Sequence, residues 1–262
     1  MTQTAAAART ALPDTLPSRK VPAVTRAVAL LRLLADSPAP LPLRDLAREV
    51  GIIPSTCLGI LRVLVAEGLV TLDPETKRYG LAAGMLTLAR PLLREDGAGH
   101  LVQPALDRIA REHMLTATLV EVFGLRHFVV TAVSRAAGLR LQIDIGRRAP
   151  ALISATGRCV AAFGGHDQAQ LRSAFARLRW DNAPAWRQWC GQVDLARRRG
   201  YGVDENHYIG GMTAIAAPVF DVRGRLRHCV TAVGMSGQFS RAGVARIGRQ
   251  LIAVATEATP PG

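Results

Sequence analysis

Hydroxyl, guanidinium and ammonium groups occur between residues 44 and 78 in an order that suits contact with nucleic acid. Lysine and arginine bind phosphate oxygens and guanine edges, and serine and threonine hydroxyls reach either phosphates or bases. Such donors can bind double-stranded DNA together only if one surface presents them. The candidate DNA-binding residues are Arg44, Ser55, Thr56, Arg62, Lys77 and Arg78.

Two short helices joined by a tight turn are predicted to position most of these groups. Apolar residues recur at helical spacing over residues 43–50, and Gly51 follows at once, where a left-handed helix cap favours glycine. Pro54 is placed to open a second helix, whose apolar face continues up to Gly68. In a helix-turn-helix of this kind the second helix lies in the major groove, while the first crosses the DNA backbone.

A small hairpin is predicted directly after Gly68. Residues 69–72 and 77–81 read as extended segments, and the turn between them contains Asp73 and Pro74. The whole unit is therefore predicted to be a winged helix-turn-helix. The alternative is a helical hairpin with a strand pair that serves only as core, but the order of elements, both glycines and the basic wing would then be coincidental.

The composition is that of a globular protein with a sizeable core. The chain has 262 residues, of which 49% are hydrophobic and 20% charged, so two domains are expected. No run approaches the roughly 20 apolar residues of a membrane helix, and residues 1–20 lack the apolar core of a signal peptide. We therefore expect a cytoplasmic protein that does not engage a membrane.

The net charge of +13 supports DNA binding only weakly, because it is not concentrated in the predicted DNA-binding unit. Residues 20–84 contain eight lysines and arginines against six aspartates and glutamates. The four cysteines have neither metal-ligand spacing nor the density of a disulfide framework, so we interpret them as core residues in a reducing compartment. No metal, cofactor or catalytic residue is predicted.

Four segments are expected along the chain. Residues 1–22 lack periodicity and are interpreted as a disordered arm, residues 23–81 as the winged helix-turn-helix domain, residues 82–99 as a linker helix, and residues 100–258 as a second domain. The linker helix is apolar on nearly every side over residues 82–93. A helix of that kind has to bury its surface, and a twin helix from a second subunit would cover it.

The second domain is predicted to mix helices and strands. A hairpin is expected over residues 116–123 and 127–133, and a half-buried strand over residues 140–145. A polar, glycine-bearing stretch at residues 154–158 then leads into a helix that continues to residue 163. Further helices are expected over residues 168–179, 186–199 and 241–255, and strands over residues 202–204, 214–220 and 226–234.

Several short stretches of this sequence together resemble the IclR-type bacterial transcriptional regulators over residues 23–255. Each match is weak alone, but their order and separations are specific. The resemblance implies an α+β protein with an N-terminal winged helix-turn-helix, a linker helix and a GAF-like α/β effector-binding domain, assembled as a dimer or a dimer of dimers. The matching stretches are LAREVG at 46–51 with Ser55 and Thr56, LDPETKRY at 72–79, ATGR at 155–158, RGYGVDE at 199–205 and AIAAPVFD at 214–221.

The resemblance also implies a receptor for a small organic acid in the second domain. Free N–H groups at Thr156 and Gly157, at the positive end of a helix dipole, would form an anion site without a charged side chain. Without the resemblance, residues 155–157 would read as an ordinary strand-to-helix loop. Carried over position by position, the implied effector-binding residues are Ala155, Thr156, Gly157, Asp204, Ala214, Thr231 and Val233.

This sequence departs from the family pattern at both expected sites. The family commonly has a His-Arg pair on the recognition helix where this chain has Leu58 and Gly59, which removes a strong base or phosphate contact. In the effector domain, Val233 stands where a hydroxyl residue can occur and Ala214 where a cysteine can. A small 2-oxo acid would find fewer partners there, so a larger or more apolar acid, such as an aromatic one, is expected.

The expected function is thus an effector-responsive DNA-binding regulator, acting as a repressor rather than an activator. Two alternatives remain open at this point. One is a sensor of small molecules that acts only through protein partners. The other is a thiol enzyme that uses Cys159 at a helix start, where a thiol pKa can be lowered; no G-x-S-x-G or P-loop pattern accompanies it.

Overall fold

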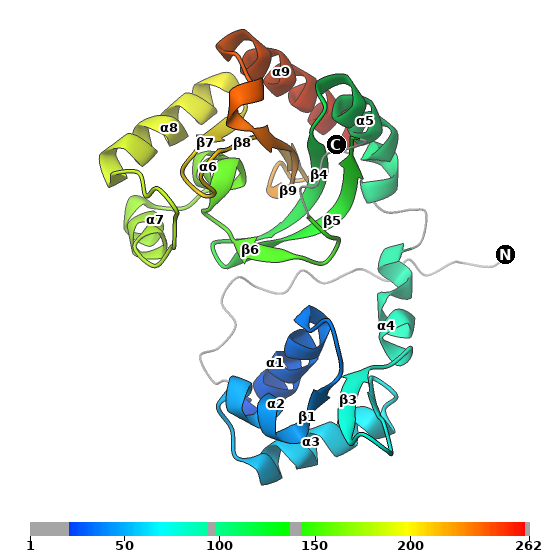
Figure 1. Ribbon diagram of the computed structural model, residues 1–262. Helices are drawn as coiled ribbons and strands as arrows, with labels where there is room; N and C mark the ends of the chain where they lie inside the picture. The colour runs from blue at the N-terminus through cyan, green and yellow to red at the C-terminus, as the bar shows by residue number, and fades with distance from the viewer. Residues whose placement is uncertain (1–20, 94–97, 137–142, 260–262) are drawn as a thin grey trace, which may run out of the picture. The chain divides into compact units, whose positions relative to one another are not determined.

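A computed structural model of the chain describes residues 21–93, 98–136 and 143–259 (Figure 1). The chain divides into two compact units between residues 94 and 95. Nearly all of the expected N-terminal arm lies outside the described residues; only its end is seen, where Pro22 opens the first helix. The segment expected as a linker is divided between the two units.

The first unit contains the predicted helix-turn-helix. Helix α1 (Pro22–Asp36) packs with α2 (Leu43–Val50) and α3 (Pro54–Ala66) around a small apolar core. Gly51 ends α2 in the left-handed conformation, with φ of 70°, and its N–H bonds back to the last turn of α2. Proline opens α3 as predicted. The core residues from these helices and the wing are Leu30, Leu34, Leu46, Ala47, Cys57, Leu61, Leu64, Val70 and Tyr79.

The wing is a three-stranded sheet rather than a simple hairpin. Strands β2 (Val70–Leu72) and β3 (Arg78–Leu81) form the predicted pair, and β1 (Leu41–Pro42) adds to the outer side of β3. The turn is held by Asp73, whose Oδ1 accepts the N–H groups of Glu75 and Thr76 at 2.9 Å each. These two donors lower the pKa of Asp73 below its usual value. Strand β1 was not predicted from the sequence.

Helix α4 (Gly84–Leu93) follows the wing and is as apolar as expected. It begins at Gly84, whose N–H bonds to the Gly68 carbonyl oxygen at 3.1 Å. A Cβ at position 84 would lie 2.3 Å from that oxygen, so only glycine fits there. Two large side chains of α4 are open to solvent: Leu86 is 65% exposed and Leu88 63% exposed.

The second unit is built on a six-stranded sheet in the order β6-β5-β4-β9-β8-β7, with every neighbouring pair antiparallel. Its elements are α5 (Ala98–His113), β4 (Thr116–Phe123), β5 (His127–Arg135), β6 (Arg148–Pro150), α6 (Ser154–Phe163), α7 (Gln168–Phe175), α8 (Trp186–Arg199), β7 (Gly202–Glu205), β8 (Met212–Phe220), β9 (Leu226–Met235), a 3-10 turn at Ser236–Gln238 and α9 (Arg241–Ala258).

Helices cover both faces of this sheet (Figure 1). Helices α5 and α9 pack on one face around Leu106, Ile215 and Leu251. On the other face α6 and α8 pack with α7 around Leu152, Val160 and Trp189. The four central strands therefore contribute side chains to two separate cores.

The structure corrects two elements of the second unit. Residues 143–145 of the strand expected over 140–145 are not in a strand, and residues 140–142 lie outside the described parts. Strand β6 takes the place beside β5 instead, because Arg148–Pro150 pairs with residues 127–129. Helix α7 ends at Phe175, four residues before its expected end.

Candidate functional site

The expected DNA-binding side chains lie on α2, α3 and the wing. Arg44, Ser55, Arg62 and Lys77 are exposed, whereas Thr56 is half-buried beside the buried Cys57. Four of these donors are thus open to a duplex, and Thr56 presents only part of its surface.

Arg78 is exposed but already has a partner inside the protein. Its Nη1 donates a hydrogen bond to the Pro40 carbonyl oxygen at 3.1 Å. Since Pro40 directly precedes β1, Arg78 ties the wing to the segment that leads into α2. It would have to keep or exchange this bond in order to contact DNA.

Because Leu58 and Gly59 stand where the family commonly has a His-Arg pair, α3 presents no polar side chain at these two positions. Leu58 is half-buried, while Gly59 is exposed and a Cβ built on it would meet no atom within 4 Å. Nothing in the fold requires glycine at position 59. Its only local effect is to weaken the helix, by about 1 kcal/mol relative to alanine.

In the second unit, strand pairing brings four of the expected effector residues onto one surface of the sheet. Val233 on β9 lies opposite Ala214 on β8, and Ala214 lies opposite Asp204 on β7. Thr231 stands two residues from Val233 and so shares its face. This is the face covered by α6, α7 and α8; we call it the effector floor, made of Asp204, Ala214, Thr231 and Val233.

Two threonines of β4 extend the effector floor, and sequence reasoning missed both. Thr118 lies opposite Thr231, and their Oγ1 atoms are 2.6 Å apart. Thr116 lies opposite Val233, is fully buried, and its Oγ1 has no hydrogen-bond partner among the described residues. An unsatisfied buried hydroxyl costs about 1–3 kcal/mol, which makes this oxygen a candidate contact for a polar atom of a ligand. The sequence could have indicated Thr116 as a site residue only if the register between β4 and β9 had been known.

The start of α6 covers this floor. Ala155 and Thr156 are buried, and Ser154 holds the left-handed backbone conformation with φ of 58°. The N–H of Gly157 donates to the Ile153 carbonyl oxygen at 2.9 Å, so the expectation that it is free was wrong. It makes the first intrahelical bond, and only the N–H groups before it belong to the open helix end. Gly157 has another role: a Cβ there would lie 2.0 Å from the Leu152 carbonyl group.

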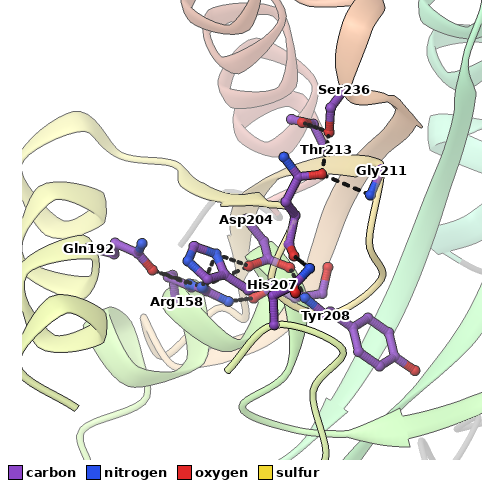
Figure 2. Close-up of polar contacts among 11 residues, drawn as sticks. Arg158, Gln192, Asp204, His207, Tyr208, Gly211, Thr213 and Ser236 are labelled. Carbon is purple, nitrogen blue, oxygen red and sulfur yellow. Dashed lines mark hydrogen bonds and ion pairs between the residues drawn. The ribbon is translucent and has the colours of Figure 1, made fainter. Parts of the chain in front are cut away.

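A fully buried arginine one turn along α6 holds the neighbouring loop (Figure 2). Arg158 forms an ion pair with Asp204, with Nη2 and Oδ1 2.7 Å apart. Its Nη1 donates to the Ser154 carbonyl oxygen at 2.8 Å, and Nε and Nη2 donate to Oε1 of Gln192 at 3.2 and 2.8 Å. The guanidinium carbon also lies 5.4 Å from the ring centre of Trp180. Burial lowers the pKa of Arg158, and the Asp204 carboxylate opposes that shift.

Asp204 is therefore engaged on both carboxylate oxygens. Oδ1 receives Arg158 and lies 3.0 Å from Nδ1 of His207, while Oδ2 accepts the Tyr208 N–H at 3.1 Å. Asp204 therefore holds the loop after β7 through contacts within the protein. Sequence reasoning quoted Arg158 as part of a motif without assigning it this partner; a cation inside an apolar helix is the signal that a partner must exist.

The Cys159 thiol is buried against the sheet and offers no accessible nucleophile. Its Sγ donates to the Ala216 carbonyl oxygen at 3.1 Å, and its exposed fraction is zero. The neighbouring Cys229 thiol is also buried, and its contact with Cys159 together with burial raises its pKa. Burial also lowers the pKa of His228 to about 4, so this ring is neutral at pH 7. The arrangement does not support the thiol-enzyme alternative.

The described ranges contain neither a cluster of metal-ligand side chains nor a single helix that could span a membrane. No three His, Cys, Asp or Glu side chains there are grouped so that they could hold a metal ion. No single helix in those ranges is long and apolar enough to cross a bilayer; α2 and α3 pass such a test only as a pair bent by 110°.

Two family models match the chain. The model for the IclR helix-turn-helix domain matches residues 23–74, and the model for the C-terminal region of the bacterial transcriptional regulator IclR matches residues 94–259. Together they span both units.

Individual relatives agree with these models. A glycerol operon regulatory protein of Streptomyces griseus is 32% identical over 230 residues, which is 86% of this chain and 87% of that protein. An IclR transcriptional regulator of Alicyclobacillus acidocaldarius has the same fold, with a TM-score of 0.78 at 23% identity over 92% of this chain and 98% of that one. An IclR homologue of Microbacterium hydrocarbonoxydans, solved with 4-hydroxybenzoate, has a TM-score of 0.70 at 18% identity over 90% of this chain and 97% of that one.

Proposed function

Because the chain belongs to the IclR family of bacterial transcriptional regulators, we propose that it binds an operator through α3 and the wing and that a small organic acid at the effector floor changes this binding. The chain is a DNA-binding regulator and not an enzyme. The observation that carries the effector half of the proposal is the orphan hydroxyl of Thr116, buried beside residues that the family resemblance had already assigned to ligand binding.

On the DNA side, α3 enters the major groove with Ser55 and Thr56 near its N-terminus, and Arg62 lies further along the same helix. Lys77 reaches a phosphate from the wing, and Arg44 contacts the backbone from α2. With Leu58 and Gly59 on α3, direct base contacts are few. Binding then depends strongly on phosphates and falls steeply with salt.

In the second unit, the acid's carboxylate lies at the open helix end before Gly157, near Ala155 and Thr156. Its body rests on Ala214 and Val233, which supply apolar surface, while Thr116 and Thr231 supply hydroxyls. This lining favours an aromatic acid that carries a further polar group. The Microbacterium relative solved with 4-hydroxybenzoate supports that class.

Ligand binding acts by population shift. The acid favours one arrangement of the residues around α6, and the two subunits of a dimer then present their recognition helices at a different spacing. We propose a homodimer, or a dimer of dimers, joined through α4, because Leu86 and Leu88 are exposed in the single chain. Repression is the proposed sign, since a dimer seated on a promoter blocks transcription without any further contact. A regulator of bacterial DNA would work in the cytoplasm.

The test is a mobility-shift titration of the full chain on the intergenic DNA beside its own gene, at fixed salt, with and without a panel of aromatic and aliphatic acids. We expect specific binding that one acid class changes. The double variant Arg62→Ala/Lys77→Ala should abolish specific binding, while the control Arg246→Ala, an exposed arginine of α9, should not. Specific binding that no acid alters would contradict the effector half, and binding no tighter than to random DNA would contradict the DNA half.

Thr116 gives the effector half a sharper test. Thr116→Val keeps the shape but removes the hydroxyl, so the unliganded second unit should gain about 1 kcal/mol of unfolding free energy while the response to a hydroxylated acid weakens. Urea unfolding can be followed by tryptophan fluorescence, because all three tryptophans, at 180, 186 and 189, lie in that unit. Thr116→Ser, which keeps the hydroxyl, is the control. An unchanged acid response in Thr116→Val would remove Thr116 from the site.

A further inference from the structure

A groove of about 720 Å³ lies at the outer edge of the second unit's sheet, beside the effector floor. Its walls come from α8 and the first turn of α9, and the edge strand β7 and the residues just after it form its base. None of the seven residues assigned to the effector lines it. Its volume is in the range of small-molecule sites in proteins.

Hydrogen bonds within the protein orient two amide side chains that line this groove. Oε1 of Gln192 is taken by Arg158, so its amide nitrogen is left without a hydrogen bond among the described residues. Asn206 is fixed in the same way: its Oδ1 accepts the Gly211 N–H at 2.8 Å and the Ser236 hydroxyl at 3.2 Å. Figure 2 shows the contacts of Gln192 with Arg158 and of Gly211 with the neighbouring amide. The side-chain amide nitrogens of Gln192 and Asn206 are thus held in fixed orientations, and neither makes a hydrogen bond among the described residues.

His207, which also lines the groove, has a defined hydrogen-bonding state. Its Nδ1 lies 3.0 Å from the Asp204 carboxylate, and a carboxylate can only accept, so the proton is on Nδ1. In the neutral ring Nε2 then carries a lone pair and can accept a hydrogen bond from a ligand. The groove therefore offers an acceptor beside the two donors.

Three charges on the groove carry no counter-charge. Arg199 at the end of α8, Glu205 at the end of β7 and Arg241 at the start of α9 form no ion pair within 4 Å in the described parts of the chain. Arg241 is also the first residue of α9, where the helix dipole disfavours a cation. An anion between Arg199 and Arg241 would compensate both.

We propose that this groove is a second ligand site and that it binds a hydroxylated organic monoanion. The two guanidinium groups receive the anionic group. Glu205 and Nε2 of His207 accept hydrogen bonds from hydroxyls, the amides of Gln192 and Asn206 donate to them, and Val203 and Val244 cover the carbon chain. Glu205 would repel a second carboxylate, which is why the site suits a single negative charge.

The groove is linked to the effector floor through Arg158. Gln192 and His207 both line the groove; Gln192 accepts from Arg158, His207 lies against Asp204, and Arg158 in turn holds Asp204 and the first turn of α6. A ligand that draws on Gln192 or His207 therefore acts on the residues that hold the neighbouring site. The inference goes beyond the proposed effector site and does not require it.

The test uses gluconate as probe with the full chain at fixed ionic strength, together with two six-carbon controls. Sorbitol has the hydroxyls without the charge, and hexanoate has the charge without the hydroxyls. We expect saturable gluconate binding by calorimetry, weaker binding of both controls, and slower hydrogen exchange over residues 188–207 and 241–245.

Matched arginine variants localise the charge. Arg199→Ala/Arg241→Ala should weaken gluconate binding by about 10-fold or more, since each removes a charge-assisted hydrogen bond. Arg198→Ala/Arg246→Ala removes the same charge from the same two helices outside the groove and should change binding by less than about 2-fold. Equal loss in both variants, exchange protection only around residues 154–160, or no saturable gluconate binding would overturn the proposal.

Discussion

At the scale of single residues, the ion pair between Arg158 and Asp204 connects several elements of the second unit. A buried guanidinium is costly to dehydrate, and the cost is offset here because the oxygens of Asp204, Gln192 and Ser154 accept from it. The pair joins α6 to the strand β7, and Gln192 adds α8. Three elements, of which α6 is distant in sequence from α8 and β7, therefore meet at one charge.

We expect Asp204→Asn to destabilise the second unit by about 3–5 kcal/mol, because it leaves the guanidinium of Arg158 buried without a counter-charge. Urea unfolding followed by tryptophan fluorescence measures this. Asp194→Asn, on the surface of α8 and paired with the exposed Arg197, is the control and should cost under about 1 kcal/mol. Equal effects of the two changes would mean that Arg158 finds another partner.

His228 gives the second unit a dependence on acid. Its pKa in the folded protein is about 4 against 6.5 for an ordinary histidine, because burial and Arg227 disfavour the charged ring. The unfolded chain therefore binds a proton more readily, so stability is full above pH 6.5 and falls as the pH drops toward 4. The loss attributable to His228 is about 3 kcal/mol.

Unfolding free energies measured from pH 7 to pH 4 should show this fall, and His228→Gln should flatten it. Glu121, which lies opposite His228 on β4 and is paired with Arg227, stays in both proteins and serves as the constant background. A variant with the same slope as the parent would assign the acid sensitivity to other groups.

Sequence reasoning at this scale found residue types but not their partners. Exposure of Arg44, Ser55, Arg62 and Lys77 follows from helical and turn patterns, which are local. The bond from Arg78 to Pro40 spans 38 residues, and the contact of Thr118 with Thr231 spans 113. Such contacts depend on strand register, which a single sequence does not specify.

At the scale of elements, two helical glycines differ in whether a larger side chain would fit in their place. Gly59 on α3 faces open solvent, whereas Gly157 on α6 is pressed against the Leu152 carbonyl group. Gly59→Ala should therefore raise the unfolding free energy of the first unit by about 0.5–1 kcal/mol, because alanine favours the helix. Thermal unfolding monitored by far-ultraviolet circular dichroism measures the gain.

Gly157→Ala is the matched opposite. Its Cβ has no room beside Leu152, so the same substitution should destabilise the second unit strongly. If Gly59→Ala also destabilised the protein, a contact on the outer surface of α3 would have been overlooked.

The elements that sequence reasoning predicted correctly are those with strong local signals. Proline and glycine mark both ends of the helix-turn-helix, and Gly124 marks the hairpin of β4 and β5. Strand β1 was missed because two residues carry no period and one of them is Pro42. The strand expected over 140–145 alternates in sequence but is replaced beside β5 by residues 148–150.

At the scale of the whole molecule, the exposed apolar side chains of α4 support the proposed second subunit. We expect Leu86→Lys/Leu88→Lys to shift the protein toward the monomer, because like charges would meet where the proposed dimer packs apolar side chains. Sedimentation at micromolar concentration measures the mass. Val222→Lys, which changes another exposed apolar residue in the β8–β9 turn, is the control. An unchanged mass for the α4 variant would place the subunit contact elsewhere.

The overall architecture was predicted through the family resemblance rather than through composition. Period and turn signals indicated helices and strands, but the order β6-β5-β4-β9-β8-β7 follows from contacts between distant strands. The effector residues on β7, β8 and β9 were assigned by resemblance and are brought into one row by that order. Thr116 joins the row only because β4 lies beside β9.

Strand β1 has a consequence for how such a chain can change in length. It is only two residues long, it pairs with β3 of the wing, and Leu43 of α2 follows it directly. An added residue within β1 would therefore shift the register of the wing and the start of α2 together. The tip of the wing at residues 74–76 is exposed and contributes no residue to the first unit's core. Insertions and deletions in relatives should accordingly gather at the tip and spare the two residues of β1.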